Sequence, residues 1–347
     1  MFSRTVLAVA VSSLAAFSTS AFAVSVNTAG GIVNGVAQFD WSPHNVLALN
    51  GQQAVENFIA AKTAVTNSIF AGTGPITPAE AIGILASGGT LDQFVNCGAA
   101  CEFTAYAQGK LGNFNDAANN PIASTLGTNF EVTFTLGYTE RVTAVVGNTA
   151  TFSFGNSLGD TPVNFFKIYY DTTVDSSDLA GTGFDDGALV FEGDVTPKNG
   201  VYSSSFTVTD TSGTDALDDF LGDDWAGTTT VEGVGATSVL DLIVEPFATN
   251  QDFNFFLNEI TKFEIANISA SLAFNSVDPS RTFPVAGVAD TAAEIGAVNG
   301  DDDRGGNSVL FQSDSNSPIA GIPEPGSIAL LSAAALAAGV MRKRSQA

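Results

Sequence analysis

A Gly-x-Ser-x-Gly motif is the pattern in this chain closest to a catalytic signature. It spans residues 155–159, with Ser157 at its centre. In hydrolases such a motif presents the nucleophilic serine on a sharp turn between a strand and a helix, and the catalytic histidine follows it in the chain. Here a Pro-containing, strand-like run follows the motif, and the single histidine, His44, precedes it. We therefore interpret residues 155–159 as a turn between strands and assign no catalytic residue.

Acidic side chains gather in one glycine-rich segment. They are Asp175, Asp178, Asp185 and Asp186. Oxygen-rich loops can hold Ca²⁺, which takes six to eight oxygen ligands, but the EF-hand order of aspartates is absent. A carboxylate pair involving Asp185 or Glu192 could instead serve a polysaccharide-active enzyme, which we keep as the alternative function. Solvated turn carboxylates are the simpler interpretation, so no metal site and no cofactor are assigned, and calcium remains a hypothesis.

The histidine and the two tryptophans add no site of their own. One histidine cannot build a typical zinc centre, and we expect His44 to be a loop residue. Trp41 and Trp225 could stack on sugar rings, but tryptophans more often pack in a core, which is what we expect.

Charge limits the partners of this chain. Lys and Arg total 12 against 36 Asp and Glu, a net charge of −24. Because such a surface repels phosphate backbones and anionic lipids, nucleic-acid binding is excluded. Neutral polysaccharide and cationic partners remain compatible with it.

The N-terminus has the features of a secretion signal. Arg4 precedes an apolar run, and Ala21 and Ala23 form a small-x-small cleavage site. Residues 1–23 are therefore predicted to be removed. In an oxidising compartment, Cys97 and Cys101 are predicted to form a disulfide that fixes a local turn.

The C-terminus combines three features in a fixed order. A helix-breaking segment, Pro323-Glu324-Pro325, precedes an apolar run, and the basic cluster Arg342-Lys343-Arg344 follows that run. An apolar stretch of this length is marginal for a permanent membrane span, and the basic cluster would stay cytoplasmic. Residues 322–347 therefore predict a transmembrane helix that anchors the chain only transiently.

This tail resembles the PEP-CTERM sorting signal, which has the same three parts at the extreme C-terminus. The resemblance implies cleavage by an exosortase, a membrane-embedded protease, after a transient inner-membrane intermediate. It also implies a Gram-negative host that produces exopolysaccharide, and release to the cell surface or the extracellular matrix.

The body of the chain is predicted to be mainly β, with a short helical part near its start. Apolar residues between Gly51 and Phe70 fall at helical spacing, and Thr77 to Glu80 resembles a capping box. From Phe130 onward, short alternating runs separated by turn residues predict a β-sandwich or jelly-roll-like body. A change of phase at Ala266-Asn267 predicts a β-bulge.

These patterns predict four regions: a signal peptide (1–23), a mainly β extracellular domain (24–275), an Asp/Gly/Ser-rich linker (276–321) and the sorting signal (322–347). Residues 164–171, 178–187 and 311–316 are similar to segments of flocculation-associated PEP-CTERM proteins. That resemblance implies a non-catalytic protein that supports exopolysaccharide-associated cell aggregation, as in flocs and biofilms. We therefore do not expect an enzyme.

Overall fold

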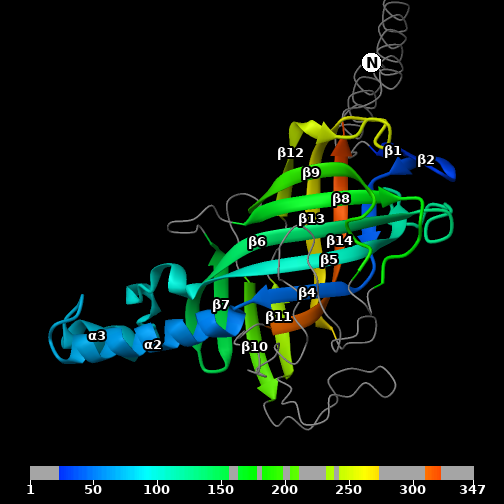
Figure 1. The fold of residues 1–347 in the computed structure, drawn as a ribbon. Helices are drawn as coiled ribbons and strands as arrows, with labels where there is room; N and C mark the ends of the chain where they lie inside the picture. The colour runs from blue at the N-terminus through cyan, green and yellow to red at the C-terminus, as the bar shows by residue number, and fades with distance from the viewer. Residues whose placement is uncertain are drawn as a thin grey trace, which may run out of the picture.

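The computed structural model describes residues 23–155, 163–177, 182–197, 204–210, 232–237, 242–272 and 309–321. These residues are mainly β, as predicted. They form a 12-stranded antiparallel sheet and a separate two-stranded sheet, with two helices beside them (Figure 1). The signal peptide apart from Ala23, the sorting signal, Ser157, Asp178 and Trp225 lie outside the described residues.

The strands follow the chain as β1 (Val24–Thr28), β2 (Gly31–Val36), β3 (Gln38–Trp41), β4 (His44–Leu49), β5 (Glu102–Asn115), β6 (Glu131–Val146), β7 (Thr149–Phe154), β8 (Asn164–Asp171), β9 (Ala188–Pro197), β10 (Ser204–Asp210), β11 (Glu232–Thr237), β12 (Leu242–Gln251), β13 (Ile260–Leu272) and β14 (Val309–Gly321). The order in the large sheet is β11-β10-β7-β6-β8-β9-β12-β13-β14-β3-β5-β4. β5 also pairs with β6, so the sheet closes into a ring that runs from β5 through β6, β8, β9, β12, β13, β14 and β3.

The core lies inside this curled sheet. Because side chains alternate between the two faces of a strand, every second residue points inward and meets residues from the opposite wall, as in a sandwich. Phe39 contacts the rings of Phe114 and Phe263 edge-on, at centroid distances of 5.3 and 5.7 Å. Such aromatic pairs each contribute about 0.5–1.5 kcal/mol beyond their buried area. Other phenylalanines of this core are Phe130, Phe134, Phe166, Phe191, Phe255 and Phe256.

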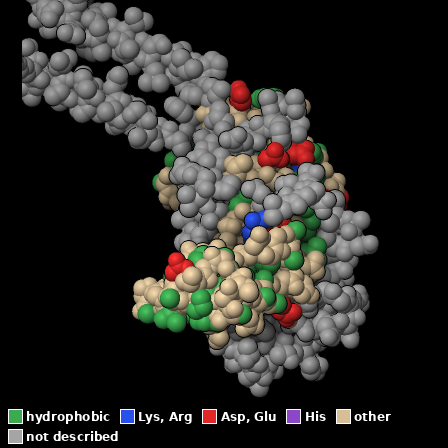
Figure 2. All heavy atoms as spheres, turned by 90° about the vertical axis from the view of Figure 1, so that its left-hand side faces the viewer, with side chains coloured by type: hydrophobic (Ala, Val, Ile, Leu, Met, Phe, Trp, Pro, Cys, Tyr) green, Lys and Arg blue, Asp and Glu red, His purple; other side chains and the backbone are tan. Residues whose placement is uncertain are grey.

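The helical part is confirmed. α2 spans Gly51–Phe70, and α3 spans Pro78–Ala86. The capping box is present: the Glu80 backbone N–H donates to Thr77 Oγ1 at 3.3 Å, and the Thr77 N–H donates to Glu80 Oε2 at 2.8 Å. Two 3-10 turns, η1 (Asp92–Phe94) and η2 (Gly98–Cys101), lead back to the sheet. Figure 2, seen from the side toward which the helices project, shows them as a mostly uncharged protrusion.

The linker prediction is wrong for Val309–Gly321, which forms β14 in the wall of the ring. This strand was not predicted, because polar residues occupy its central positions. Its inward-facing positions include Ser313, Ser315 and Ser317, all of them buried. Serines at three successive inward positions, before the buried Ile319, remove the apolar alternation by which strands are recognised. Residues 273–308, the rest of that segment, lie outside the described residues.

Two further details can be compared with the sequence predictions. The β-bulge expected at Ala266-Asn267 lies one residue later, because the pairing with β14 shifts between Asn267 and Ser269. The loop prediction for His44 is wrong: this residue begins β4, and its side chain is buried in the core.

Candidate functional site

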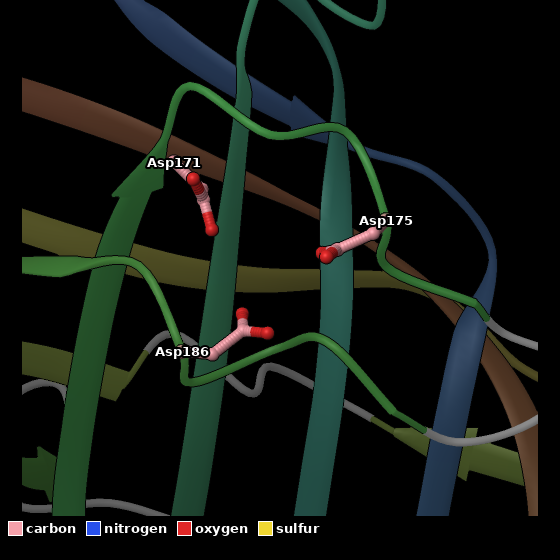
Figure 3. A group of neighbouring side chains, drawn as sticks. All are labelled: Asp171, Asp175 and Asp186. Atoms are coloured by element: carbon pink, nitrogen blue, oxygen red, sulfur yellow. The ribbon is translucent and has the colours of Figure 1, made fainter.

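Three carboxylates converge beside the β8–β9 pair. Asp171 ends β8, Asp175 lies in the loop that follows, and Asp186 lies just before β9. The antiparallel pairing of Tyr170 with Ala188 brings together the two ends of the connection between β8 and β9. One oxygen from each carboxylate lies within 4.8 Å of the others, and Figure 3 shows the three side chains pointing toward one another. We call these three residues the acidic triad.

A buried glutamate fixes the loop that carries the triad. Glu131, at the start of β6, accepts hydrogen bonds on Oε1 from the backbone N–H groups of Asp175 and Ser176, at 3.1 and 2.9 Å. The Ser176 hydroxyl donates to its other oxygen. Gly183 lets the later part of the same connection approach Ser176 closely, because a Cβ at Gly183 would lie 2.8 Å from Ser176 Cα and its φ is +79°. The position of Asp175 is therefore set by the fold.

The triad is partly what the sequence predicted. Asp175 and Asp186 meet, whereas Asp185, also in the predicted cluster, is not a member of the group. Asp171 was missed as a member, although it lies four residues before Asp175 at the end of a strand-like run. Glu192, a candidate for a catalytic carboxylate pair, forms an ion pair with Lys167 at 3.2 Å. One oxygen from each carboxylate gives three of the six to eight oxygens that Ca²⁺ takes, so second carboxylate oxygens, backbone carbonyls or water would have to complete such a site.

A second polar group lies on the outer face of β3, β5 and β14, and we call it the carboxamide array. Its members are Gln38, Asp40, Asn115, Asn119, Asp314 and Asn316. Phe39 and Trp41 point into the core, so Gln38 and Asp40 point to the other face. Across the sheet, Asn316 pairs with Asp40 in register.

Hydrogen bonds link the members of the carboxamide array. With its amide oriented to satisfy both neighbours, Asn316 donates to Asp40 Oδ1 at 2.6 Å and accepts from Gln38 Nε2 at 2.7 Å. Asn115 donates to Asn119 at 3.0 Å. Partial burial, and then the neighbouring negative charge of Asp40, raises the pKa of Asp314 above its usual value. Among the described residues, neither Asp40 nor Asp314 forms an ion pair with a cationic side chain.

His44 and Trp41 belong to the core and not to a surface site. The Trp41 ring lies 4.7 Å from that of Phe134, and its Nε1 donates to Ser317 Oγ at 2.8 Å. His44 packs edge-on against Phe134, and its Nδ1 lies 3.0 Å from the carbonyl oxygen of Ser42. Burial lowers the pKa of His44 to about 4. The core prediction for Trp41 is confirmed.

The cysteines lie as predicted. Cys97 and Cys101 are at disulfide distance, with their Cα atoms 5.7 Å apart. Cys101 is buried against Phe58 of α2 and Phe103 of β5. Asn57 of α2 donates to the carbonyl of Ala100 in the same short loop, at 2.7 Å. The bridge thus fixes a turn that holds the start of α2 against the sheet.

Comparison with protein-family models, with curated proteins and with solved structures gives no match. Within the described part of the chain, no helix has the length and apolar character needed to cross a membrane. The predicted C-terminal apolar helix lies outside that part.

Proposed function

We propose that the chain is an exported, exosortase-processed surface or matrix protein that supports exopolysaccharide-associated cell aggregation without catalysing a reaction. One observation carries this proposal. Val24, which follows the predicted signal cleavage site, begins β1, and Gly321, which precedes the sorting tail, ends β14. The two residues pack together, since a Cβ on Gly321 would lie 2.9 Å from Val24 Cγ1.

This arrangement suits a protein processed at both ends. The predicted signal peptide precedes Val24 and the predicted sorting tail follows Gly321, so both segments are attached at the same place on the fold. The body can therefore stand on the outer side of the inner membrane while either segment is inserted. Removal of residues 1–23 and of the tail beyond Pro325 would leave the packing of Val24 against Gly321 in place. The PEP-CTERM resemblance of residues 322–347 supplies the protease expected at the second site.

The carboxamide array supports polysaccharide as the partner. Carboxamides offer donors and acceptors together, and carboxylates add acceptors, which matches the hydroxyl groups of a neutral sugar chain. An anionic polymer would be repelled by the net charge of −24. We therefore propose a neutral exopolysaccharide, bound along the outer face of β3, β5 and β14.

Processing is tested by the intact mass and location of the protein in its host. The wild-type chain should lose both terminal segments and leave the membrane. A variant in which Pro323, Glu324 and Pro325 are replaced by alanine should retain Arg342 to Ala347 and remain at the inner membrane. Release of that variant with a trimmed tail would remove the main support for a sorting signal.

Binding is tested by retardation in gels that contain the host's exopolysaccharide. The double variant Gln38→Ala with Asn316→Ala should lose most of the retardation. Both changes remove a carboxamide of the array, and with it the donor and acceptor that would bind the sugar hydroxyls. Asn129→Ala is the matched control, since Asn129 is exposed and lies outside the array. The polysaccharide should keep its chain length during incubation; shortening would favour the alternative, a polysaccharide-active enzyme.

A further inference from the structure

The two helices form an arm that stands away from the sheet. We define the helical arm as residues 51–91. Its first half packs on the sheet through Ala54 and Phe58, which contact Phe103 and Val142. Its second half has a small core of its own, made of Ile69, Ala81 and Leu91. Figure 1 shows the arm projecting away from β1 and β2, and so from the end of the molecule where Val24 and Gly321 meet.

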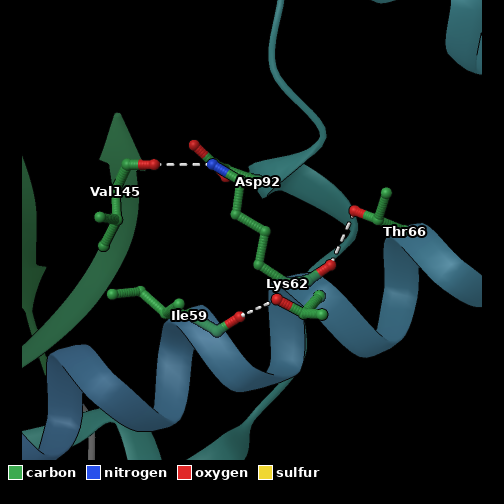
Figure 4. A network of polar contacts seen from close by, with 6 residues as sticks. Ile59, Lys62, Thr66, Asp92 and Val145 are labelled. Carbon is green, nitrogen blue, oxygen red and sulfur yellow. Dashed lines mark hydrogen bonds and ion pairs between the residues drawn. The ribbon is translucent and has the colours of Figure 1, made fainter. Parts of the chain in front are cut away.

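A partly buried ion pair fixes the direction of the arm. Lys62 of α2 contacts Asp92 Oδ1 at 2.6 Å and donates to the backbone carbonyl of Val145 in β6, also at 2.6 Å (Figure 4). Asp92 is buried at the start of η1. The middle of α2 is thereby tied both to the sheet and to the chain that returns from α3. The outer part of the arm is held in one position by these contacts.

The arm exposes large apolar side chains. Ile82 and Leu85 on α3 are 57% and 47% exposed, and Ile59 and Phe70 on α2 are 45% and 48% exposed. Ile82 and Leu85 lie three residues apart and so share one face of α3. Ile59 and Phe70 lie 11 residues apart, about three helical turns, and so share one face of α2. The arm therefore carries apolar surface that the described part of the chain leaves uncovered.

The outer part of the arm, residues 63–91, is also nearly free of charge. The 347-residue chain holds 36 Asp and Glu and 12 Lys and Arg. Residues 63–91 contain one of them, Glu80, and its carboxylate is engaged in the capping box with Thr77. Two copies of a chain with a net charge of −24 repel each other over most of their surface. At the tips of their arms this repulsion is weakest, because the charged bodies stay apart.

We infer that the helical arm is a self-association surface, on which the arm of one molecule packs against the same arm of a second copy. An apolar, uncharged face matches another face of the same kind. A membrane surface fits less well, because interfacial helices carry Lys and Arg on their polar face, and the one lysine of the arm is bound to Asp92. A cationic protein would find only two carboxylates on the arm, Glu56 and Glu80.

Such a contact is expected to be two-fold symmetric and weak. When one patch serves both molecules, each residue of the interface is used twice, once from each copy. We expect a short two-helix arm to bury less than the ~800 Å² per partner of a standard stable interface. Repulsion between the acidic bodies opposes it further, so added salt should strengthen the association by screening that repulsion.

Sedimentation velocity of the processed protein tests the inference. The weight-average mass should rise toward that of a dimer as the concentration approaches about 100 μM, and should rise more in 0.5 M salt than in ~0.05 M. The double variant Ile82→Glu with Leu85→Glu should associate at least tenfold more weakly. Far-UV circular dichroism and melting temperature confirm that the variant folds.

A matched control separates the arm from general surface hydrophobicity. Ile32 and Phe253 are each 57% exposed and lie outside the arm. Ile32→Glu with Phe253→Glu makes the same change in charge and should leave association unchanged. A protein that stays monomeric at all concentrations and salts would overturn the inference. So would equal loss of association in both double variants, or binding to phosphatidylcholine vesicles without self-association. None of these outcomes depends on polysaccharide binding.

Discussion

Gly321 packs against Val24, so the last residue of β14 lies beside the first residue of β1. Val24 is completely buried, and a Cβ on Gly321 would also approach the carbonyl oxygen of Glu259, at 3.0 Å. The described fold thus begins and ends at one place, although nearly 300 residues separate the two positions. Any group that enlarges Gly321 must displace either β1 or the chain before β13.

Gly321→Ala is therefore expected to destabilise the fold by about 1–3 kcal/mol, the usual range for a side chain forced into packed surroundings. Chemical denaturation measures this change. Gly83→Ala is the control, because no atom lies within 4 Å of a Cβ at that helical position and its φ is not positive. Replacing a glycine inside a helix should stabilise the protein by about 0.5–1 kcal/mol. The two substitutions should have opposite signs, and equal effects would contradict the packing argument.

The ion pair between Lys62 and Asp92 gives a second prediction. Lys62→Met leaves the Asp92 carboxylate buried without its cation, so stability should fall by about 1–3 kcal/mol, below the range for fully buried pairs because Lys62 is partly exposed. Asp92→Leu should have a smaller effect, since the lysine can turn toward water.

The double variant Lys62→Met with Asp92→Leu should recover most of the loss caused by Lys62→Met alone. A double-mutant cycle from urea unfolding gives the coupling between the two side chains. Additive effects would show that the pair does not hold the arm.

His44 predicts a specific loss of stability in acid. Its pKa is about 4 in the folded protein, against 6.5 as the ordinary value. As the pH falls below 6.5 the unfolded chain gains a proton that the folded protein excludes, so stability decreases until the pH reaches about 4. The full difference corresponds to about 3 kcal/mol.

The test compares the free energy of unfolding of the wild type and of His44→Asn between pH 7 and pH 4. Carboxylates contribute alike to both proteins, so the difference in slope isolates the histidine. The variant should lose less stability over this interval. Parallel curves would mean that His44 becomes protonated in the folded state without penalty.

The sequence predicted the elements whose residues follow one simple period. α2 has the expected bounds because its apolar residues recur at helical spacing. The capping box at Thr77 could be predicted because it depends on residues three apart. β14 was not predicted as a strand, because what buries its serines is distant in the sequence. The Ser317 hydroxyl accepts a hydrogen bond from Trp41 Nε1, a contact across 276 positions that no local pattern reveals.

The same limit applies to the candidate sites. Two members of the acidic triad could be predicted from the sequence, since Asp175 and Asp186 lie in one glycine-rich segment. Asp171 joins them only through the pairing of β8 with β9. The carboxamide array could not be predicted, because it collects polar residues from β3, β5 and β14 and none of these was predicted as a strand.

The acidic triad provides the last prediction. Three carboxylates with oxygens within 4.8 Å repel one another unless a cation lies between them. In the presence of a chelator, Asp186→Asn should therefore raise the melting temperature by about 1–2 °C, as expected for relief of a surface repulsion. Asp185→Asn removes the same charge from the same loop but not from the triad, and should change the melting temperature less.

Millimolar Ca²⁺ then decides the calcium hypothesis: a bound ion would raise the wild-type melting temperature above that of Asp186→Asn and reverse their order. If Ca²⁺ leaves the order unchanged, the triad consists of solvated carboxylates held together by Glu131 and the β8–β9 pairing alone.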